Sequence, residues 1–223
     1  MKKIVLLLLV ASLLVLPGCG LLKKVGIGAN KDVTKICEIA NQSVPTKIIT
    51  DVSLATKLGD SLSGYYVTTT DGTNMIFDYT YQRLATPEES VALGSSERYI
   101  TAKGVVNYKD GVYFSGEGDE WRPGTGTAFD LKFNISEEFF KNATVEAEGT
   151  VLKATVSKEV LKQIIGTDLN AVGDAEITLE TNGINLTKVS VVCSTENGTL
   201  SLRTSYTYNR QQLFPESEET ETT

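Results

Sequence analysis

Apolar and polar residues alternate along much of the chain, which is the pattern of β-strands with one buried face. Residues 65–70 are rich in strand formers and end at the turn pair Asp71-Gly72, which predicts a hairpin. In the next strand one face carries four large apolar residues: Met75, Phe77, Tyr79 and Tyr81. Residues 99–115 repeat the scheme around the turn Lys109-Asp110-Gly111, so a second hairpin is expected there.

The same alternation continues towards the C-terminus. Strands are predicted for residues 128–135, 144–148 and 150–156, and three more lie between residues 177 and 208. The turns Asn182-Gly183 and Glu196-Asn197-Gly198 join these last three strands. Because strands joined by tight turns are antiparallel, the sequence predicts one antiparallel sheet of about eight to ten strands.

Helical spacing interrupts this pattern in three places. After the capping residue Asn30, the spacing i, i+3, i+4, i+7 predicts a helix over residues 31–42 with one apolar face. Two shorter helices are predicted for residues 136–142 and 158–165, each opened by a serine cap, and Gly166 ends the second. The predicted fold class is therefore mainly β (α+β), with one N-terminal helix and two short helices.

The first residues have the layout of an export signal: Lys2 and Lys3, then a 13-residue apolar run from Ile4 to Leu16. A helix of that length falls short of the roughly 20 residues that cross a bilayer. Leu16-Pro17-Gly18-Cys19 resembles the lipobox of bacterial lipoproteins. The resemblance implies a signal peptide over residues 1–18 and a diacylglyceryl group, with chains such as palmitate, on Cys19. Two acyl chains suffice for stable anchoring, so we expect the protein on the extracytoplasmic face of a bacterial membrane.

Charge and composition restrict the kinds of partner that the protein can bind. Cleavage after residue 18 removes two lysines and leaves 19 basic and 28 acidic residues, which disfavours nucleic acid or an anionic bilayer surface as a partner. Residues 19–29 are expected to be the lipidated cysteine and a tether, and residues 30–210 to be one domain. Residues 211–223 form an acidic tail with little to bury, so we expect it to be disordered.

The residue types present restrict which catalytic and metal-binding sites the chain can form. The chain has no histidine, which excludes Ser-His-Asp and Cys-His catalysis and every His-ligated metal site. We therefore predict a protein that is not an enzyme and holds no metal or cofactor. Glu117, Asp119 and Glu120 stand close to Trp121 in a glycine-rich loop. This loop is either a calcium or sugar site or a solvated turn, and the sequence leaves the choice open.

Two cysteines remain in the expected mature domain once Cys19 is lipidated. They are Cys37, in the first helix, and Cys193, in a late strand. Outside the cytoplasm they can form a disulfide, and the alternative is a pair of buried thiols.

The order of elements, a helix, a long antiparallel meander and short helices before the last three strands, resembles the LolA-like lipoprotein-carrier superfamily and related lipid-binding lipoproteins. The resemblance covers about residues 30–210. It implies an open, curved sheet, an unclosed half-barrel whose concave side is covered by helices. It also implies an apolar cavity between sheet and helices that receives acyl chains, with residues 136–142 and 158–165 as lids.

We therefore expect a lipid or other apolar ligand in a cavity under these lids. Helices this short are unstable alone, so their apolar residues must dock onto the sheet. The expected cavity residues are Phe77, Tyr79, Phe139, Phe140, Leu161, Ile164 and Ile165. The alternative is a non-catalytic scaffold or interaction lipoprotein of the envelope, which needs a protein partner and no cavity.

Overall fold

The computed structural model describes residues 31–92, 94, 98–110, 112–116, 122–124, 135–166, 168–209 and 213. The helices are α2 (Lys31–Gln42), α3 (Pro87–Ala92), the 3₁₀ helix η2 (Glu137–Phe140) and α4 (Lys158–Ile165). The first strands are β1 (Lys47–Thr56), β2 (Ser61–Thr70), β3 (Met75–Leu84), β4 (Tyr99–Lys109), β5 (Val112–Gly116) and β6 (Arg122–Gly124). The later strands are β7 (Thr144–Glu148), β8 (Val151–Val156), β9 (Ala171–Thr181), β10 (Leu186–Thr195) and β11 (Gly198–Thr207).

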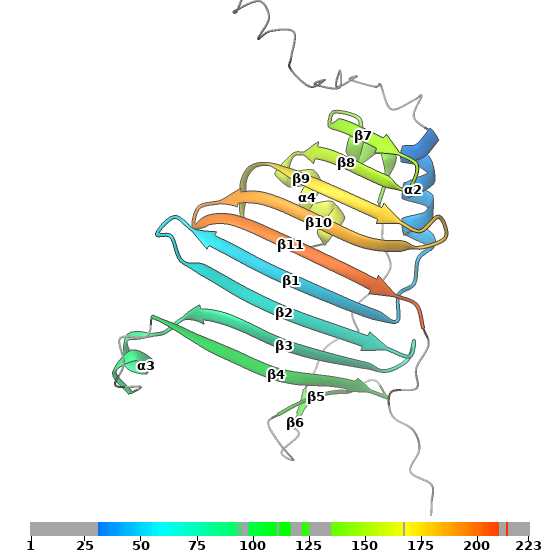
Figure 1. Ribbon diagram of the computed structural model, residues 1–223. Coiled ribbons are helices and arrows are strands. Elements are labelled where there is room, and N and C mark those ends of the chain that lie inside the picture. The colour runs from blue at the N-terminus through cyan, green and yellow to red at the C-terminus, as the bar shows by residue number, and fades with distance from the viewer. Residues whose placement is uncertain are drawn as a thin grey trace, which may run out of the picture.

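The described strands form one eleven-stranded antiparallel sheet (Figure 1). Its order is β6-β5-β4-β3-β2-β1-β11-β10-β9-β8-β7, so two meanders meet where β1 pairs with β11. That pairing runs from Lys47 opposite Thr207 to Thr56 opposite Gly198. The edge strands β6 and β7 lie at opposite ends of the sheet. The predicted fold class, an unclosed antiparallel sheet with a few helices, is confirmed.

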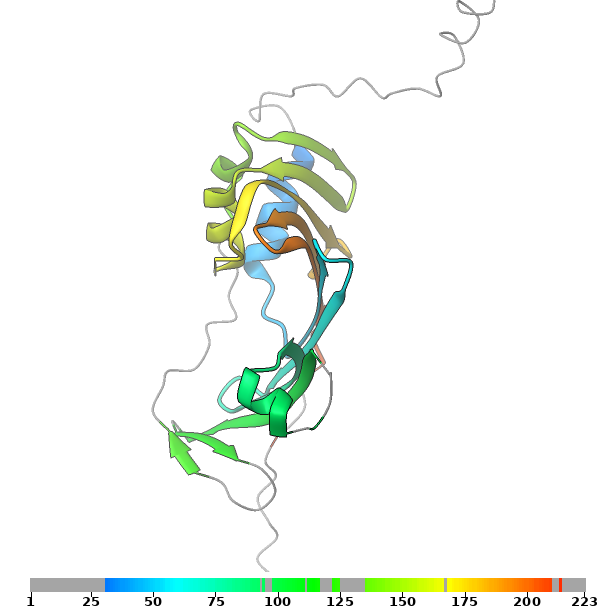
Figure 2. The same cartoon turned by 90° about the vertical axis from the view of Figure 1, so that its left-hand side faces the viewer.

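The helices α2, η2 and α4 lie on one face of the sheet, and the sheet curves around them (Figure 2). We call this the helix face and the opposite one the outer face. The four α2 residues at helical spacing, Val33, Ile36, Cys37 and Ala40, are each at most 3% exposed. They pack with side chains of β8, β9 and β10 in the hydrophobic core. The predicted helix over residues 31–42 is thus confirmed with its apolar face.

Polar side chains fix the end of α2 to the sheet. The Ser43 hydroxyl donates to the carbonyl of Ile39 at 2.7 Å and accepts from the backbone N–H of Leu186 at 2.8 Å. The Asn41 side chain bonds both backbone groups of Ile135, at 2.7 and 2.9 Å. Because these groups are buried or half-buried, losing either side chain would leave backbone groups unsatisfied.

Both short helices begin at the predicted serine caps. The hydroxyl of Ser136 accepts from the N–H of Glu138 at 3.2 Å, and that of Ser157 accepts from Val160 at 3.4 Å. Gly166 ends α4 with φ of 77°, the left-handed conformation that glycine adopts without strain.

Three elements differ from the prediction. Strand β1 and helix α3 were not predicted, and the sheet has more strands than expected. The predicted strand over residues 128–135 lies outside the described residues apart from Ile135, which is not in a strand. The signal peptide, the tether and nearly all of the acidic tail also lie outside them. Among the described helices, none has the length and apolarity needed to cross a membrane.

Candidate functional site

The helix face extends from the strands beside the helices onto strands β1–β4. One lateral row across seven strands follows from the register: Ile177, Val191, Leu202, Val52, Gly64, Tyr81 and Ala102. Ile177 and Val191 are each 1% exposed, whereas the row becomes half-buried from Leu202 onward. The packing contacts of α2, η2 and α4 are with β7–β10, so the two halves of this face have different environments.

Four aromatic rings lie on the helix face of β2 and β3. We call Tyr66, Phe77, Tyr79 and Tyr81 the aromatic cluster. Tyr66 stacks on Phe77 and on Tyr81, with ring centroids 6.2 and 6.4 Å apart and interplanar angles of 14° and 16°. Phe77 and Tyr79 are 5.8 Å apart, and Tyr79 and Tyr81 are 5.9 Å apart. These spacings are within the range of favourable aromatic pairs, so the rings form a continuous surface.

Two glycines let these rings lie against the sheet. A Cβ atom at Gly104, opposite Tyr79, would come within 2.6 Å of the Cζ atom of that ring. A Cβ atom at Gly64 would come within 2.9 Å of Cε2 of Tyr66. Since real Cβ atoms do not approach so closely, each ring occupies the space that a side chain would otherwise fill. The rings of Tyr79 and Tyr66 therefore lie directly against the sheet at these two positions.

Mostly apolar side chains lie around the aromatic cluster. On the helix face of β1, β2 and β4 the apolar ones are Ile48, Val52, Leu62, Ile100, Ala102 and Val106, and all are half-buried. The uncharged polar residues Thr50 and Thr68 lie opposite Tyr66 and Phe77 on the same face. In the second half of the sheet the equivalent residues Leu152, Ile177 and Leu179 are 0–1% exposed. The first half thus has an apolar surface that is only partly withdrawn from solvent.

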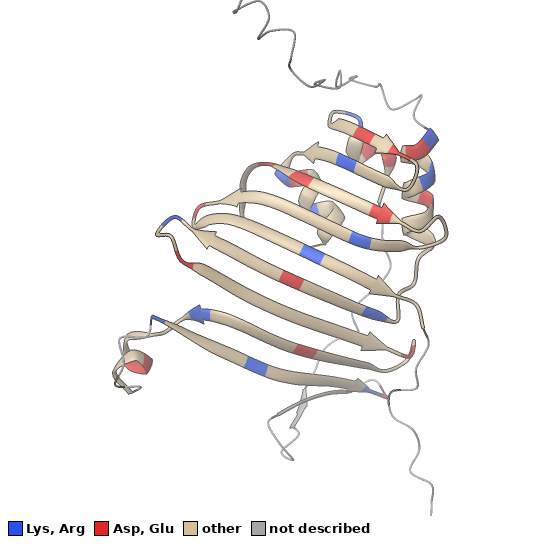
Figure 3. Cartoon of the chain, in the orientation of Figure 1, with Lys and Arg blue, Asp and Glu red and all other residues tan. Residues whose placement is uncertain are grey.

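The charged residues of these strands lie almost entirely on the other face. By register, Lys47, Asp51, Asp78, Lys103 and Lys109 belong to the outer face. They are spread singly along the ribbons (Figure 3). Arg83 is on the helix face at the end of β3, where it pairs with Glu89 at 2.7 Å. The aromatic cluster itself carries no formal charge.

Burial and the neighbouring Tyr81 hydroxyl raise the pKa of Tyr66 above its usual value. The phenol therefore stays neutral over the physiological pH range. An uncharged ring surface favours contact with apolar matter over ions.

The structure separates the residues expected to line the cavity. Phe77 and Tyr79 lie in the aromatic cluster, whereas Phe140 and Leu161 are 0% and 1% exposed within the core. Phe139, Ile164 and Ile165 are half-buried and pack against that core. Five of the seven expected cavity residues therefore belong to the packed core beneath η2 and α4, and Phe77 and Tyr79 lie apart from them on β3.

The cysteines are both buried, and both are free thiols. They belong to the same core, where Cys37 is 3% exposed and Cys193 is also 3% exposed. Burial, with smaller contributions from Glu137 and Glu38, raises the pKa of Cys37 to about 12. Burial also raises the pKa of Cys193. Of the two alternatives, the structure contains the pair of buried thiols.

The other candidate sites give little chemistry. Glu117, Asp119, Glu120 and Trp121 lie outside the described residues. Asp71 is a turn residue whose Oδ1 accepts from the N–H groups of Thr73 and Asn74 at 2.9 and 2.8 Å. Within the described ranges no three acidic or cysteine side chains come together as a metal site.

Tyr66 is the member of the aromatic cluster that the sequence analysis did not single out. Its place follows from the turn at residues 71–74, which puts Thr70 opposite Met75 and therefore Tyr66 opposite Tyr79. A register count from that turn was the available signal. The contribution of Gly104 had no such signal, because it depends on the pairing of β3 with β4 across a longer connection.

Comparison with known proteins gives fold-level similarities only. No protein-family model and no curated protein sequence matches the chain. Among solved structures it is similar to LprF from Mycobacterium bovis, at 11% identity and a TM-score of 0.43, covering 83% of this chain and 98% of that one. It is also similar to the LolA superfamily protein NE2245 from Nitrosomonas europaea, at 8% identity and a TM-score of 0.33, covering 83% and 96%. Such similarity does not establish a function.

Proposed function

We propose that this chain is a lipid-anchored protein of the bacterial cell envelope that binds a lipid acyl chain, or an apolar ligand of similar shape, on the helix face of β1–β4. The observation that carries the proposal is the aromatic cluster with its uncharged, half-buried apolar surroundings. A contiguous apolar surface that stays accessible to solvent commonly marks an interaction or ligand site.

The energetics favour an acyl chain as the ligand. Burying one methylene group contributes about 0.8 kcal/mol, so eight methylenes against these rings would contribute about 6 kcal/mol before the entropic cost of binding. The rings of Phe77, Tyr79 and Tyr81 lie side by side along β3, with centroids 5.8 and 5.9 Å apart. This row offers an extended acyl chain a continuous apolar contact. No charged group is needed for this contact.

The proposal includes lipidation of Cys19. Cys19→Ser removes the thiol that accepts the lipid, so the variant should leave the membrane fraction or persist as an uncut precursor. Metabolic labelling with a fatty acid should mark the wild-type chain alone. Equal labelling of both proteins would contradict the anchor.

Two neighbouring valines of β4 provide the test of the apolar site. Val106 is opposite Phe77 on the helix face, while Val105 is opposite Asp78 on the outer face, and both are half-buried. The full chain is placed in phosphatidylcholine vesicles with a trace of a diazirine-bearing fatty acid, illuminated, and digested for mass spectrometry. We expect crosslinks in β2–β4 peptides of the wild type.

Val106→Asp should reduce these crosslinks at least fivefold, because a carboxylate next to an acyl chain must be desolvated or protonated. Val105→Asp should leave them unchanged. Equal crosslinking of wild type and Val106→Asp, or no crosslinks in β2–β4 at all, would favour the alternative of an envelope scaffold that binds a protein partner.

A further inference from the structure

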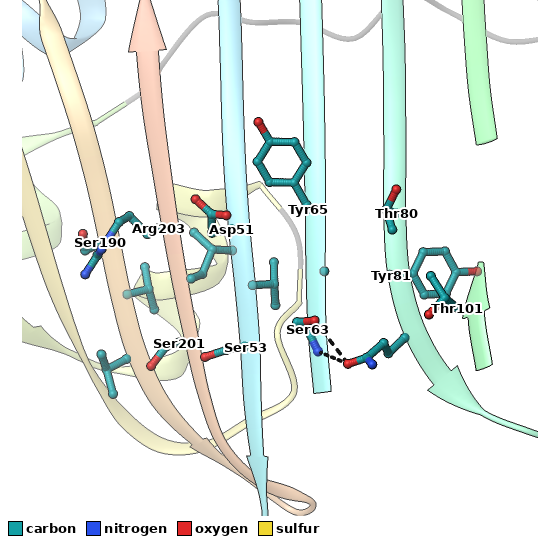
Figure 4. Close-up of a pocket in the computed structure, with 16 residues that line it drawn as sticks. Asp51, Ser53, Ser63, Tyr65, Thr80, Tyr81, Thr101, Ser190, Ser201 and Arg203 are labelled. Atoms are coloured by element: carbon teal, nitrogen blue, oxygen red, sulfur yellow. Dashed lines mark hydrogen bonds between the residues drawn. The ribbon is translucent and has the colours of Figure 1, made fainter. Parts of the chain in front are cut away.

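A groove with a volume of about 780 Å³ lies on the outer face, across the middle of the sheet (Figure 4). Its lining comes from β10, β11, β1, β2, β3 and β4, and the volume is within the range of about 300–1,000 Å³ for small-ligand sites. The lining also includes Tyr81 of the aromatic cluster, together with Val52, Gly64, Val191 and Leu202. By register these five residues belong to the helix face, whereas the side chains of Asp51, Ser53, Ser63, Tyr65, Gln82 and Arg203 belong to the outer face. The outer-face side chains therefore form a second surface, on the opposite side of the sheet from the rings of the aromatic cluster.

Short polar side chains from five neighbouring strands make up one side of the groove. They are Ser201, Ser53, Ser63, Gln82 and Thr101, in strand order β11, β1, β2, β3 and β4. Ser63 and Gln82 are joined, since the Gln82 Oε1 accepts from both the N–H and the hydroxyl of Ser63 at 3.1 Å (Figure 4). Hydroxyl and amide groups both donate and accept hydrogen bonds. This side of the groove thus offers both kinds of partner.

Three larger side chains stand two residues further along the same strands. Arg203 is opposite Asp51, and Asp51 is opposite Tyr65. The Tyr65 residue is 45% exposed, which leaves its ring available for stacking. In the part of the chain that the structure describes, neither Asp51 nor Arg203 takes part in a salt bridge. Their charged groups are available to a ligand, and their formal charges cancel.

We propose that this groove binds a neutral β-linked oligosaccharide lying across the strands. A pyranose ring has hydroxyls around its edge and apolar C–H groups on its faces. The hydroxyls match the Ser, Gln, Asp and Arg side chains, and the C–H face matches the ring of Tyr65. The repeat of such a chain, roughly 5 Å per ring, is close to the strand spacing of about 4.7–4.9 Å. Successive sugars therefore meet equivalent positions on successive strands.

Other polymers fit the groove less well. An extended peptide repeats about every 3.3 Å per residue and falls out of step with the strand spacing. A nucleic acid needs several cations for its phosphates, whereas Arg203 is the only basic residue among the described residues that line the groove. The balance of Asp51 against Arg203 likewise favours a neutral ligand.

The test uses the full chain in a zwitterionic detergent, which has no sugar headgroup. Three soluble probes are titrated by calorimetry: the β-1,4-linked tetrasaccharides of glucose, N-acetylglucosamine and mannose. At least one should bind the wild type, and Tyr65→Ala should weaken its association constant at least tenfold. Tyr65→Phe keeps the ring and should stay within threefold of the wild type. Gln82→Ala should weaken binding at least threefold.

Leu58→Ala is the matched control, because Leu58 is 72% exposed and lies outside the groove lining. It should bind the probe as the wild type does. Circular dichroism of each variant shows that the fold is retained. The proposal is overturned if no tetrasaccharide binds the wild type at 5 mM. It is equally overturned if folded Tyr65→Ala binds as tightly as Leu58→Ala.

Discussion

Replacing Leu161 by alanine tests whether α4 is part of the core or a lid over a ligand space. Leu161 is 1% exposed and lies in the same packed cluster as the buried residues of α2 and β8–β10. Truncating a fully buried leucine removes its transfer free energy and leaves a cavity, which together cost about 2–5 kcal/mol. A helix of eight residues cannot hold itself in place, so α4 depends on this contact.

We expect Leu161→Ala to lower the free energy of unfolding by about 3 kcal/mol and the melting temperature by about 6–12 °C. Ile164→Ala, in the same helix but half-buried, should cost about 1 kcal/mol. Urea unfolding of residues 20–223, followed by far-UV circular dichroism, measures both variants. If Leu161→Ala costs less than 1 kcal/mol, α4 is a mobile lid, and the account of a packed core under it is wrong.

Three further predictions follow from the structure. Burial of Cys37 and Cys193 should prevent their alkylation by iodoacetamide at pH 8 in the native state and allow it in guanidinium; resistance in guanidinium without reductant would indicate a disulfide instead. Arg83 lowers the pKa of Glu89 to about 2, so this contribution to stability is complete above the ordinary carboxyl pKa and is lost as the pH falls towards 2. The protection factors of the α3 amides, each taken relative to the intrinsic exchange rate at the same pH, should fall between pH 4.5 and 2. Gly198, at φ of 152°, has no room for a Cβ atom beside β1, so Gly198→Ala should cost at least about 2 kcal/mol in urea unfolding.

The second half of the sheet could be predicted from the sequence because its signals are local. Strands β9, β10 and β11 alternate over most of their length and are joined by the glycine turns at Asn182-Gly183 and 196–198. The serine caps and Gly166 likewise determine the ends of the short helices within a few residues. Local chemistry of this kind does not depend on the rest of the fold.

Strand β1 was harder to predict because its neighbours are distant in sequence on one side. It pairs with β11, with Lys47 opposite Thr207. Its outer face carries the polar residues Asp51 and Ser53, so its sequence does not look like that of a central strand. Helix α3 is held by a capping box: Thr86 and Glu89 bond each other's backbone N–H groups at 3.2 and 2.9 Å. That motif is visible in the sequence, but the helix has no buried residue and thus no apolar periodicity.

The site could be predicted only in part, for a related reason. Alternation placed Phe77 and Tyr79 on an inward face, but it cannot tell which half of that face the helices cover. The inner residues of β1–β4 include many apolar side chains, as do those of β8–β10. What distinguishes the two halves is the position of α2 and α4, whose contacts are with β7–β10. Long-range packing, absent from any local pattern, therefore determined where the apolar surface stays accessible.

This division of the sheet has a consequence for stability and function together. Strands β8–β10 gain from burial on the helix face, whereas β1–β4 depend more on cross-strand pairs, each worth about 0.2–1 kcal/mol. Regions with fewer buried contacts open at lower free energy, and ligand sites are commonly drawn from them. A ligand present at 100 times its Kd stabilises the native state by about 2.7 kcal/mol, close to the cost expected for Leu161→Ala. An acyl chain on the aromatic cluster would therefore contribute to β1–β4 what α2 and α4 contribute to β8–β10, by covering an apolar face.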